Sequence, residues 1–154
     1  MAKSYSRELS KYVKGWLHDQ KYNHKFYEEK GVFRLEFGVD CSVQRYTLIF
    51  KIHGEGIGSK SLIPIDVMES KRPAIAEFFT RVNHQIIDGN FEMDFSDGEV
   101  AFKMYMHTPN VPAEDRLLRT AIIHNSMWSE YGDAFLKVVF ADVDPQTAIT
   151  QIED

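Results

Sequence analysis

Apolar residues recur with two different periods along this 154-residue chain, and each change of period marks a new element. From Tyr5 to Gln20 they recur every three or four residues, with Lys and Arg on the other side, which predicts an amphipathic helix. From Phe33 to Val39, and again from Tyr46 to Ile52, apolar and polar residues alternate, as in strands with one buried face. We therefore expect a helix and then two antiparallel strands, joined by a turn at Asp40-Cys41-Ser42.

A third strand is predicted where Ile63, Ile65 and Val67 resume the alternation after Gly54-Glu55-Gly56-Ile57-Gly58, which we interpret as a flexible hairpin tip. Pro64 lies inside this strand and has no N–H to donate. The strand is therefore expected either at an edge of the sheet or with an irregularity at Pro64. An edge would make it a candidate surface for a partner.

The second half of the chain begins with a second helix, whose apolar positions run from Ile75 to Ile86 and which should end near Asp88-Gly89. A hairpin follows. Its two strands are predicted from the alternation in Phe91–Phe95 and Val100–Met106, and Ser96-Asp97-Gly98 supplies the turn.

The last helix, predicted from about Pro112 to Phe140, carries apolar residues on two faces. The face expected to pack on the sheet comprises Leu118, Ala121, Ile122, Asn125, Trp128, Gly132, Phe135, Leu136 and Val139. A second seam comprises Ile123, Met127, Tyr131, Ala134 and Val138. Because one face suffices for one sheet, this seam is either covered by another helix, with the first helix as the candidate, or binds a second subunit or a protein partner.

In chain order the elements are α-β-β-β-α-β-β-α, which predicts an α+β fold with an antiparallel sheet. The length fits a single domain over residues 1–154. With 44% hydrophobic and 27% charged residues, the composition is that of an ordinary globular protein with a real core.

The net charge and the absence of targeting segments limit the partners and the cellular compartment that we expect for this protein. A net charge of -5 disfavours a broad non-specific nucleic-acid surface, so nucleic acid is not expected as a partner. The chain has neither a cleavable signal nor an apolar run long enough to cross a membrane, and its single Cys41 has no intramolecular partner. These features predict a cytoplasmic protein that does not bind membranes.

The polar residues do not form a recognisable reactive group. The six histidines lack the spacing of a zinc protease, although His53 and His107 would share a polar face if their strands paired. The acidic hairpin around Asp97 lacks the further oxygen ligands of a calcium loop, and Ser126 beside His124 and Asn125 diverges from both on a helix. We expect no catalytic residue, no cofactor and no metal site.

Five segments carry a resemblance to a known family: Arg72-Pro73-Ala74, Phe79 to Asn83, Gly89-Asn90-Phe91-Glu92, Asp97-Gly98-Glu99-Val100 and Val111-Pro112. They resemble the YbjN family, whose members are labelled as bacterial sensory transduction regulators. The resemblance covers the second half of the chain. It implies a fold similar to that of type III secretion chaperones, which are small acidic proteins that commonly pair as dimers and bind extended segments of other proteins. It implies no catalytic residue, and it implies helix-end and turn roles for Asn83, Gly89, Asp97 and Gly98.

The function expected from these observations is that of a noncatalytic, chaperone-like binding or regulatory module, in the form of a homodimer. It would recognise a protein partner through the second seam of the last helix or through a sheet edge. The alternative is a small-ligand sensor with a pocket between sheet and helices, lined by Met93, Met104, Met106 and Trp128.

Overall fold

The computed structural model describes residues 4–153, which form an α+β fold with one antiparallel six-stranded sheet. The elements are α1 (Arg7–Asp19), β1 (Lys25–Tyr27), β2 (Val32–Gly38), β3 (Arg45–Ile52), β4 (Gly56–Asp66), the short 3-10 helix η1 (Glu69–Lys71), α2 (Arg72–Asn83), β5 (Asn90–Met93), β6 (Glu99–His107), α3 (Glu114–Phe140) and α4 (Pro145–Glu153). The expected fold class is confirmed. The sequence analysis missed the short strand β1 and the last helix α4.

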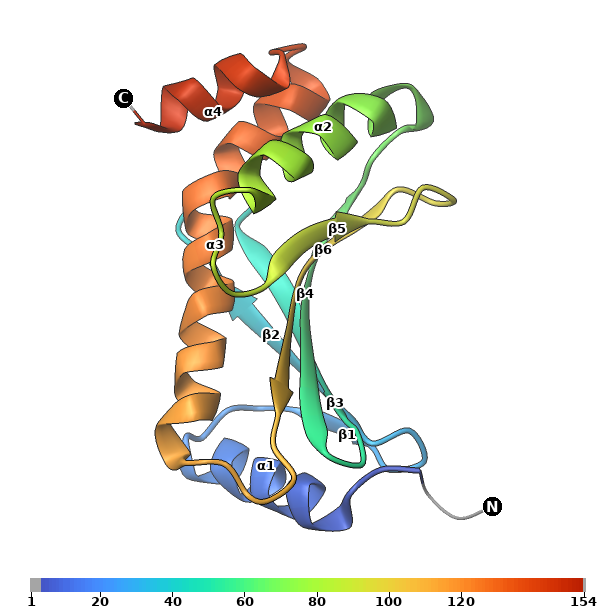
Figure 1. The fold of residues 1–154 in the computed structure, drawn as a ribbon, viewed down its shortest axis with the longest axis vertical. Helices are drawn as coiled ribbons and strands as arrows, with labels where there is room; N and C mark the ends of the chain where they lie inside the picture. Colours follow the sequence, from blue (N-terminus) through green and yellow to red (C-terminus); the bar gives the residue numbers. More distant parts are fainter. Residues whose placement is uncertain (1–3, 154) are drawn as a thin grey trace.

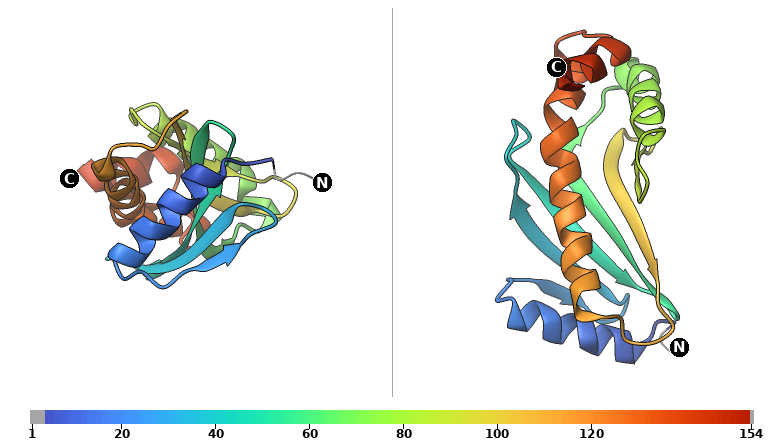
Figure 2. Two further views of the ribbon diagram at one scale, coloured as in Figure 1. Left: turned by 90° about the horizontal axis from the view of Figure 1, so that it is seen from below. Right: turned by 60° about the vertical axis from the view of Figure 1, so that its left-hand side comes forward.

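The strands lie in the order β1-β2-β3-β4-β6-β5, and the helices lie on one face of the sheet. Figure 1 shows α3 running along this face, with α1 across one end of it and α2 and α4 at the other end. The turned views in Figure 2 show the same arrangement, and no helix of the described chain covers the opposite face. The strict alternation of buried and exposed residues in β2 and β3 follows from this one-sided cover.

Strand β4 corrects the expectation that the Pro64 strand forms an edge. It is central, between β3 and β6, and the edges of the sheet are β1 and β5. Pairing with β3 ends at Leu62, and the register with β6 shifts between Leu62 and Asp66. Pro64 therefore sits at an irregularity, where its missing N–H does no harm, and this second part of the expectation is confirmed.

The glycine-rich stretch before β4 is only partly a turn. Gly54 and Glu55 form the turn, and the strand already begins at Gly56. A Cβ at Gly56 would clash with the Tyr105 hydroxyl, so the absence of a side chain allows Tyr105 to lie across β4. The stretch thus combines a hairpin turn with a site of close approach on the uncovered face of the sheet.

Helix α2 ends at Asn83 rather than near Gly89, and the reason is a hydrogen-bonded pair at the edge of the sheet. The Asn83 side chain accepts from the Phe91 N–H at 2.8 Å and donates to the Phe91 carbonyl at 2.9 Å. It satisfies both backbone groups of a residue in the edge strand β5. Gly98 has a φ of +82° in the β5–β6 turn, where the Asp97 carboxylate accepts the Glu99 N–H, and this confirms the expected turn geometry.

Helix α3 passes the β2–β3 turn at Gly132 without a kink. A Cβ at Gly132 would lie 2.7 Å from Cys41 Sγ and 3.2 Å from Val43 Cγ2. Nearby, the Asp133 carboxylate accepts the Ser42 N–H at 2.8 Å. The half-buried Cys41 is therefore a packing residue under α3, and burial raises the pKa of its thiol.

Helix α4 begins at a capping signal that the sequence analysis overlooked. The Asp144 carboxylate accepts the Thr147 N–H at 3.0 Å, and Pro145 occupies the first helical position. The carboxylate also accepts the Thr147 hydroxyl, and this hydrogen bond, followed by the one from the Thr147 N–H, holds the pKa of Asp144 below its usual value. The buried residues Ala148 and Ile149 of α4 belong to the same apolar core as α2 and α3.

We predict that Gly132→Ala destabilises the protein by about 1 kcal/mol or more, because overpacking against Cys41 outweighs the gain in helix propensity. In a Cys41→Ala background the closest obstacle is gone, so the same change should be less destabilising by about 0.5 kcal/mol or more. Urea unfolding of wild type, the two single variants and the double variant, followed by tryptophan fluorescence, measures both changes in stability. An equal loss of stability from Gly132→Ala in both backgrounds would show that Cys41 does not limit the size of the residue at position 132.

Candidate functional site

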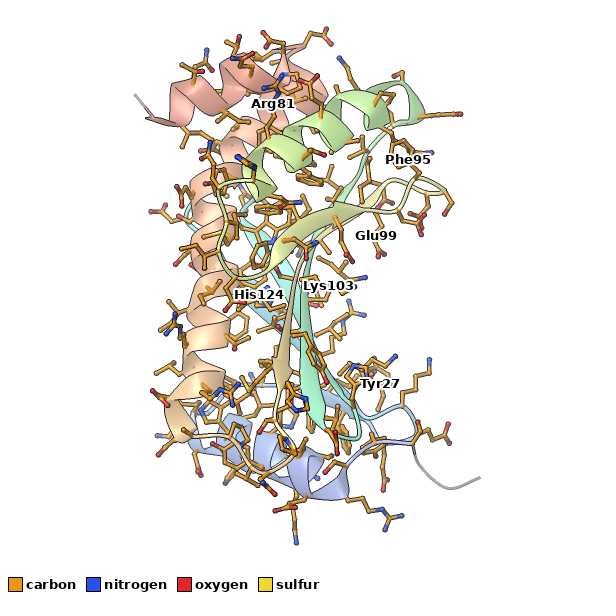
Figure 3. All side chains as sticks on the ribbon, in the orientation of Figure 1. Tyr27, Arg81, Phe95, Glu99, Lys103 and His124 are labelled. Carbon is orange, nitrogen blue, oxygen red and sulfur yellow. The ribbon has the colours of Figure 1, made fainter. Side chains whose placement is uncertain are left out.

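A completely buried histidine joins α3 to the middle of the sheet. His124 has no solvent-exposed surface, and its two ring nitrogens face two serines of the central strand β4. Nδ1 lies 2.7 Å from Ser61 Oγ, and Nε2 lies 2.8 Å from Ser59 Oγ. Figure 3 shows His124 between α3 and the sheet. Both polar positions of the ring are therefore satisfied inside an apolar core.

Trp128, one turn further along α3, completes this group. Its indole Nε1–H donates to Ser61 Oγ at 2.9 Å, and Ser61 makes a long hydrogen bond of 3.5 Å to the Phe102 carbonyl. When His124 carries its proton on Nδ1 and donates to Ser61, Ser59 donates to Nε2 and every polar hydrogen has an acceptor. We call Ser59, Ser61, His124 and Trp128 the polar lock.

The polar lock explains why the sequence analysis misplaced the inward face of α3. One row of buried α3 residues, spaced three or four apart, comprises Leu117, Thr120, His124, Trp128, Tyr131, Phe135 and Val138. Two of them are polar, and the buried face of β4 likewise carries Ser59 and Ser61. An apolar-only pattern skips these positions. A signal was nevertheless present, because polar residues on one face of each element can satisfy one another.

Burial lowers the pKa of His124 from 6.5 to about 3, because the charged imidazolium would lose its hydration. The ring is therefore neutral at neutral pH. A serine hydrogen-bonded to a neutral histidine also occurs in the catalytic triad of serine hydrolases. Here, however, Ser59 is only 4% exposed, and the other ring nitrogen of His124 faces Ser61 instead of a carboxylate. A base with such a low pKa is also poorly matched to proton transfer at pH 7. The geometry supports a structural role.

A small hollow opens beside the polar lock, between the first half of α3 and the sheet. Its volume is about 220 Å³, and its lining includes Ser59, Met104, Met106, Thr120 and Ile123. Ligand pockets usually occupy about 300–1,000 Å³. Two of the four residues expected to line a sensor pocket are therefore at this hollow. Met93 does not line it, and Trp128 is buried in the polar lock.

The second seam of the last helix divides into two parts. Tyr131, Ala134 and Val138 are buried, with exposures of 8%, 3% and 1%. Ile123 and Met127 are half-buried and remain partly accessible. Within the described residues α3 packs on α2 and α4, which lie at its carboxy-terminal half in Figure 1, and it has no comparable contact with α1. A role in partner binding stays a prediction, and it concerns Ile123 and Met127.

The residues expected to pack on the sheet divide in a similar way. Trp128, Gly132, Phe135 and Val139 are buried, whereas Leu118 and Ile122 are 39% and 54% exposed. The true inward face of α3 lies between the two predicted faces, since His124 and Thr120 occupy it. In the first half of α3 both predicted faces consequently lie on its flanks.

The strand order also corrects one expectation about histidines. His53 and His107 do not lie on adjacent strands, because β4 separates β3 from β6. Residues 4–153 contain no group of three or more His, Cys, Asp or Glu side chains placed to hold a metal ion. In the same part of the chain, each helix is too short or too polar to cross a membrane.

We predict that the polar lock makes stability depend on pH. The pKa of His124 is lower in the folded state than its ordinary value near 6.5, so the unfolded chain binds the proton first. The contribution of the neutral His124 ring to the free energy of unfolding is complete above about pH 6.5. Below that pH it falls by up to about 1.4 kcal/mol per pH unit toward pH 3. Urea unfolding between pH 7 and pH 4.5 should show a shallower loss in His124→Gln than in wild type. The exposed His84→Gln serves as the control, and identical slopes for wild type and His124→Gln would contradict the account.

Comparisons with known proteins show what this fold is similar to. Neither the protein-family models nor the curated proteins contain a match. Among solved structures, the crystal structure of YbjN from E. coli, described there as a proposed transcription regulator, superposes with a TM-score of 0.59 at 10% identity. The match covers 86% of this chain and 89% of that chain. This likeness shows a shared fold, and membership of the YbjN family stays a prediction.

Proposed function

We propose that this chain is a noncatalytic regulatory module that binds a protein through the outward side of α3, with a second copy of the chain as its partner. The observation that carries the proposal is an apolar surface on the first half of α3. We call Leu118, Ile122, Ile123 and Met127 the α3 patch. Leu118 and Ile122 are large apolar residues that the fold leaves 39% and 54% exposed.

A hollow beside the α3 patch offers room for a partner's side chains. It has a volume of about 250 Å³ and is lined by Tyr22, Phe37, Tyr46, Leu118, Ala121, Ile122, Asn125 and Ser126. Aromatic walls next to exposed aliphatic residues are typical of the anchor pockets of protein interfaces. The α3 patch therefore provides both projecting side chains and a recess that could receive the same side chains from a second copy.

The α3 patch is held on a rigid base. Asn125 donates to the Gly38 carbonyl at 3.0 Å and to the Tyr46 hydroxyl at 3.1 Å, and the polar lock fixes the opposite side of the helix. A surface that is already ordered loses less conformational entropy on binding. This favours recognition by a preformed helix face over binding that requires folding.

Charge along α3 favours a second copy as the partner. Arg119 follows Leu118 near the amino-terminal end of the α3 patch, and Glu130 lies beyond its carboxy-terminal end. When two α3 helices cross antiparallel about a two-fold axis, Arg119 of each copy approaches Glu130 of the other, and Ile122 faces the small Ser126. A parallel arrangement would place like charges together.

The noncatalytic character of the proposed module has two supports. The buried Ser59 and His124 lack the carboxylate and the open access of a hydrolase triad. The solved structure with the same fold is described as a proposed transcription regulator. Binding by strand addition at Pro64 is not part of the proposal, because β4 is central.

We predict that wild type has twice the mass of its 17.9 kDa chain in light scattering, and that Ile122→Asp is a folded monomer. A buried, unpaired carboxylate at a dimer interface is strongly unfavourable, whereas an exposed position in the monomer tolerates it within about 0.5 kcal/mol. Phe95→Asp is the matched control, because Phe95 is 57% exposed and lies far from α3 in Figure 3. It should remain dimeric.

Two outcomes would contradict this proposal. One is a wild-type mass of 17.9 kDa at every concentration up to the millimolar range, which would exclude the second copy as partner. The other is a dimer that persists in both Ile122→Asp and Leu118→Asp, which would place the interface elsewhere on the molecule.

A small-ligand sensor is the second candidate function, and the hollow beside the polar lock favours it. Met104 and Met106 line that hollow as the sequence analysis expected, together with Arg116 and Thr120. Its volume of about 220 Å³ suits only a small ligand. Heat stabilisation by such a ligand at constant mass would favour the sensor, whereas stabilisation with rising protein concentration would favour the dimer.

A further inference from the structure

The face of the sheet without helices carries a row of cations at one level. The register pairs Lys25 with Arg34, Arg34 with Ile49, Ile49 with Lys60 and Lys60 with Lys103. Directly paired residues of antiparallel strands point to the same face, and neighbouring strands lie about 4.8 Å apart. Four positive side chains therefore line up across five strands. Figure 3 places Lys103 on the opposite side of the sheet from His124.

This row is unfavourable for folding alone. Lys25 faces Arg34 directly, and Lys60 faces Lys103 directly, although like charges in such pairs repel. The Glu92 carboxylate lies 3.3 Å from Lys60 and 3.5 Å from Lys103, so one negative charge is shared between two ammonium groups. A net positive charge remains at this point of the sheet, and a bound anion would neutralise it.

The next level of the same face combines another cation with aromatic rings. The register places Lys51, Gly58 and Tyr105 side by side on β3, β4 and β6. The Tyr105 side chain is 56% exposed, and the His53 ring lies against it with centroids 5.8 Å apart. Gly58 has no side chain, which leaves room for the His53 ring beside it.

A hollow of about 330 Å³ lies at this point, lined by Ile49, Lys51, His53, Gly58, Ser59, Lys60, Lys103, Met104 and Tyr105. Gly58 is part of its lining, the His53 and Tyr105 rings form part of its walls, and the lining also includes Lys51, Lys60 and Lys103. A Cβ on Gly58 would lie 3.3 Å from His53 Nε2, so a larger side chain at this position would press against the ring and reduce the hollow. We call this hollow, with Lys51, His53, Gly58, Lys103 and Tyr105, the basic pocket.

We propose that the basic pocket binds a nucleotide, with the base against the Tyr105 and His53 rings beside Gly58 and the phosphate among Lys51, Lys60 and Lys103. Exposed aromatic rings stack with nucleobases, and lysines bind phosphate as point charges. An acidic peptide would use the cations but would leave the two rings without a partner. The combination therefore favours a planar, phosphorylated ligand.

The size of the charged area limits the ligand to one or a few nucleotides. Asp66 and Glu99 face the same side of the sheet beyond the cation row, at the end where β4 is irregular, and Glu36 lies there 3.5 Å from Arg34 of the row. They would repel a polymer that continued in that direction. The acidic net charge of -5 is thus compatible with a local basic pocket, although it disfavours a broad nucleic-acid surface.

A free mononucleotide and a nucleotide within a single strand of RNA present the same chemistry to the basic pocket.

The proposal does not depend on the α3 patch, which lies on the other side of the sheet. Loss of the dimer in Ile122→Asp would therefore leave nucleotide binding intact, and loss of nucleotide binding would leave the dimer intact.

The test is a calorimetric titration of the full chain at low salt with AMP, with inorganic phosphate, with adenosine and with a ten-residue oligoadenylate. We expect AMP to bind at least about tenfold more tightly than phosphate or adenosine alone, since each of these lacks one half of the recognised chemistry. Tighter binding of the oligoadenylate would identify single-stranded RNA as the source, and equal binding per site would identify the mononucleotide.

Three variants locate the site. Gly58→Val fills the hollow without changing the charge, and a β-branched residue suits a strand, so AMP binding should be lost while circular dichroism stays that of wild type. Lys103→Gln, at an exposed position, should lower the affinity for AMP about tenfold. Lys11→Gln makes the same charge change on the exposed side of α1 and should bind as wild type does.

Specific results would overturn the proposal. These are the absence of binding of both AMP and oligoadenylate at millimolar concentration, phosphate binding as tightly as AMP, or unchanged AMP binding in both Gly58→Val and Lys103→Gln. Displacement of AMP by an equal concentration of a glutamate-rich peptide would also overturn it, because it would show that charge alone is recognised.

Discussion

The hydrogen-bonded contact between His124 and the two serines of β4 fixes the arrangement on which both surfaces of this protein depend. Four side chains with polar groups, Ser59, Ser61, His124 and Trp128, meet in a largely apolar core. Each partner is satisfied only when α3 lies at one rotation and one height on the sheet, because an unpaired polar group in this position is costly. An apolar contact would tolerate small shifts of the helix. The polar lock therefore selects a single position of α3 on the sheet. It does so only while the buried His124 imidazole is neutral.

That position decides which residues of α3 reach solvent. With His124 pointing inward, Leu118 and Ile122 turn outward and form the exposed part of the α3 patch. The second half of the helix packs on α2 and α4, and Tyr131 and Val138 are buried there. All helices lie on one face of the sheet, so the other face remains open and can carry the basic pocket. The two proposed binding surfaces consequently lie on opposite sides of one thin layer, and occupancy of one does not obstruct the other.

Much of this fold could be predicted from the sequence, because alternation and helical periodicity are local properties. The strands β2, β3 and β6, the hairpin turn at Gly98 and the extent of α3 all follow from patterns within a few residues. The central position of β4 could not be predicted, since Pro64 indicates an edge unless the register shift is known. The face of α3 was misjudged because its key positions are polar, and their partners, Ser59 and Ser61, are more than sixty residues away in the chain. The basic pocket was missed for the same reason, because its cations come from separate strands and meet only through the register.

The polar lock is tested most directly by the nitrogen resonances of His124 in a two-dimensional NMR spectrum of protein with ¹⁵N-labelled histidine. The account predicts a neutral ring with its proton on Nδ1, unchanged from pH 7.5 to pH 5.0, because burial lowers the pKa of His124 to about 3. His124→Gln identifies the resonances by their loss. An imidazolium at pH 5.0, or a ring that exchanges between its two tautomers, would show that Ser59 and Ser61 do not hold His124 in place, and the fixed position of α3 would lose its basis.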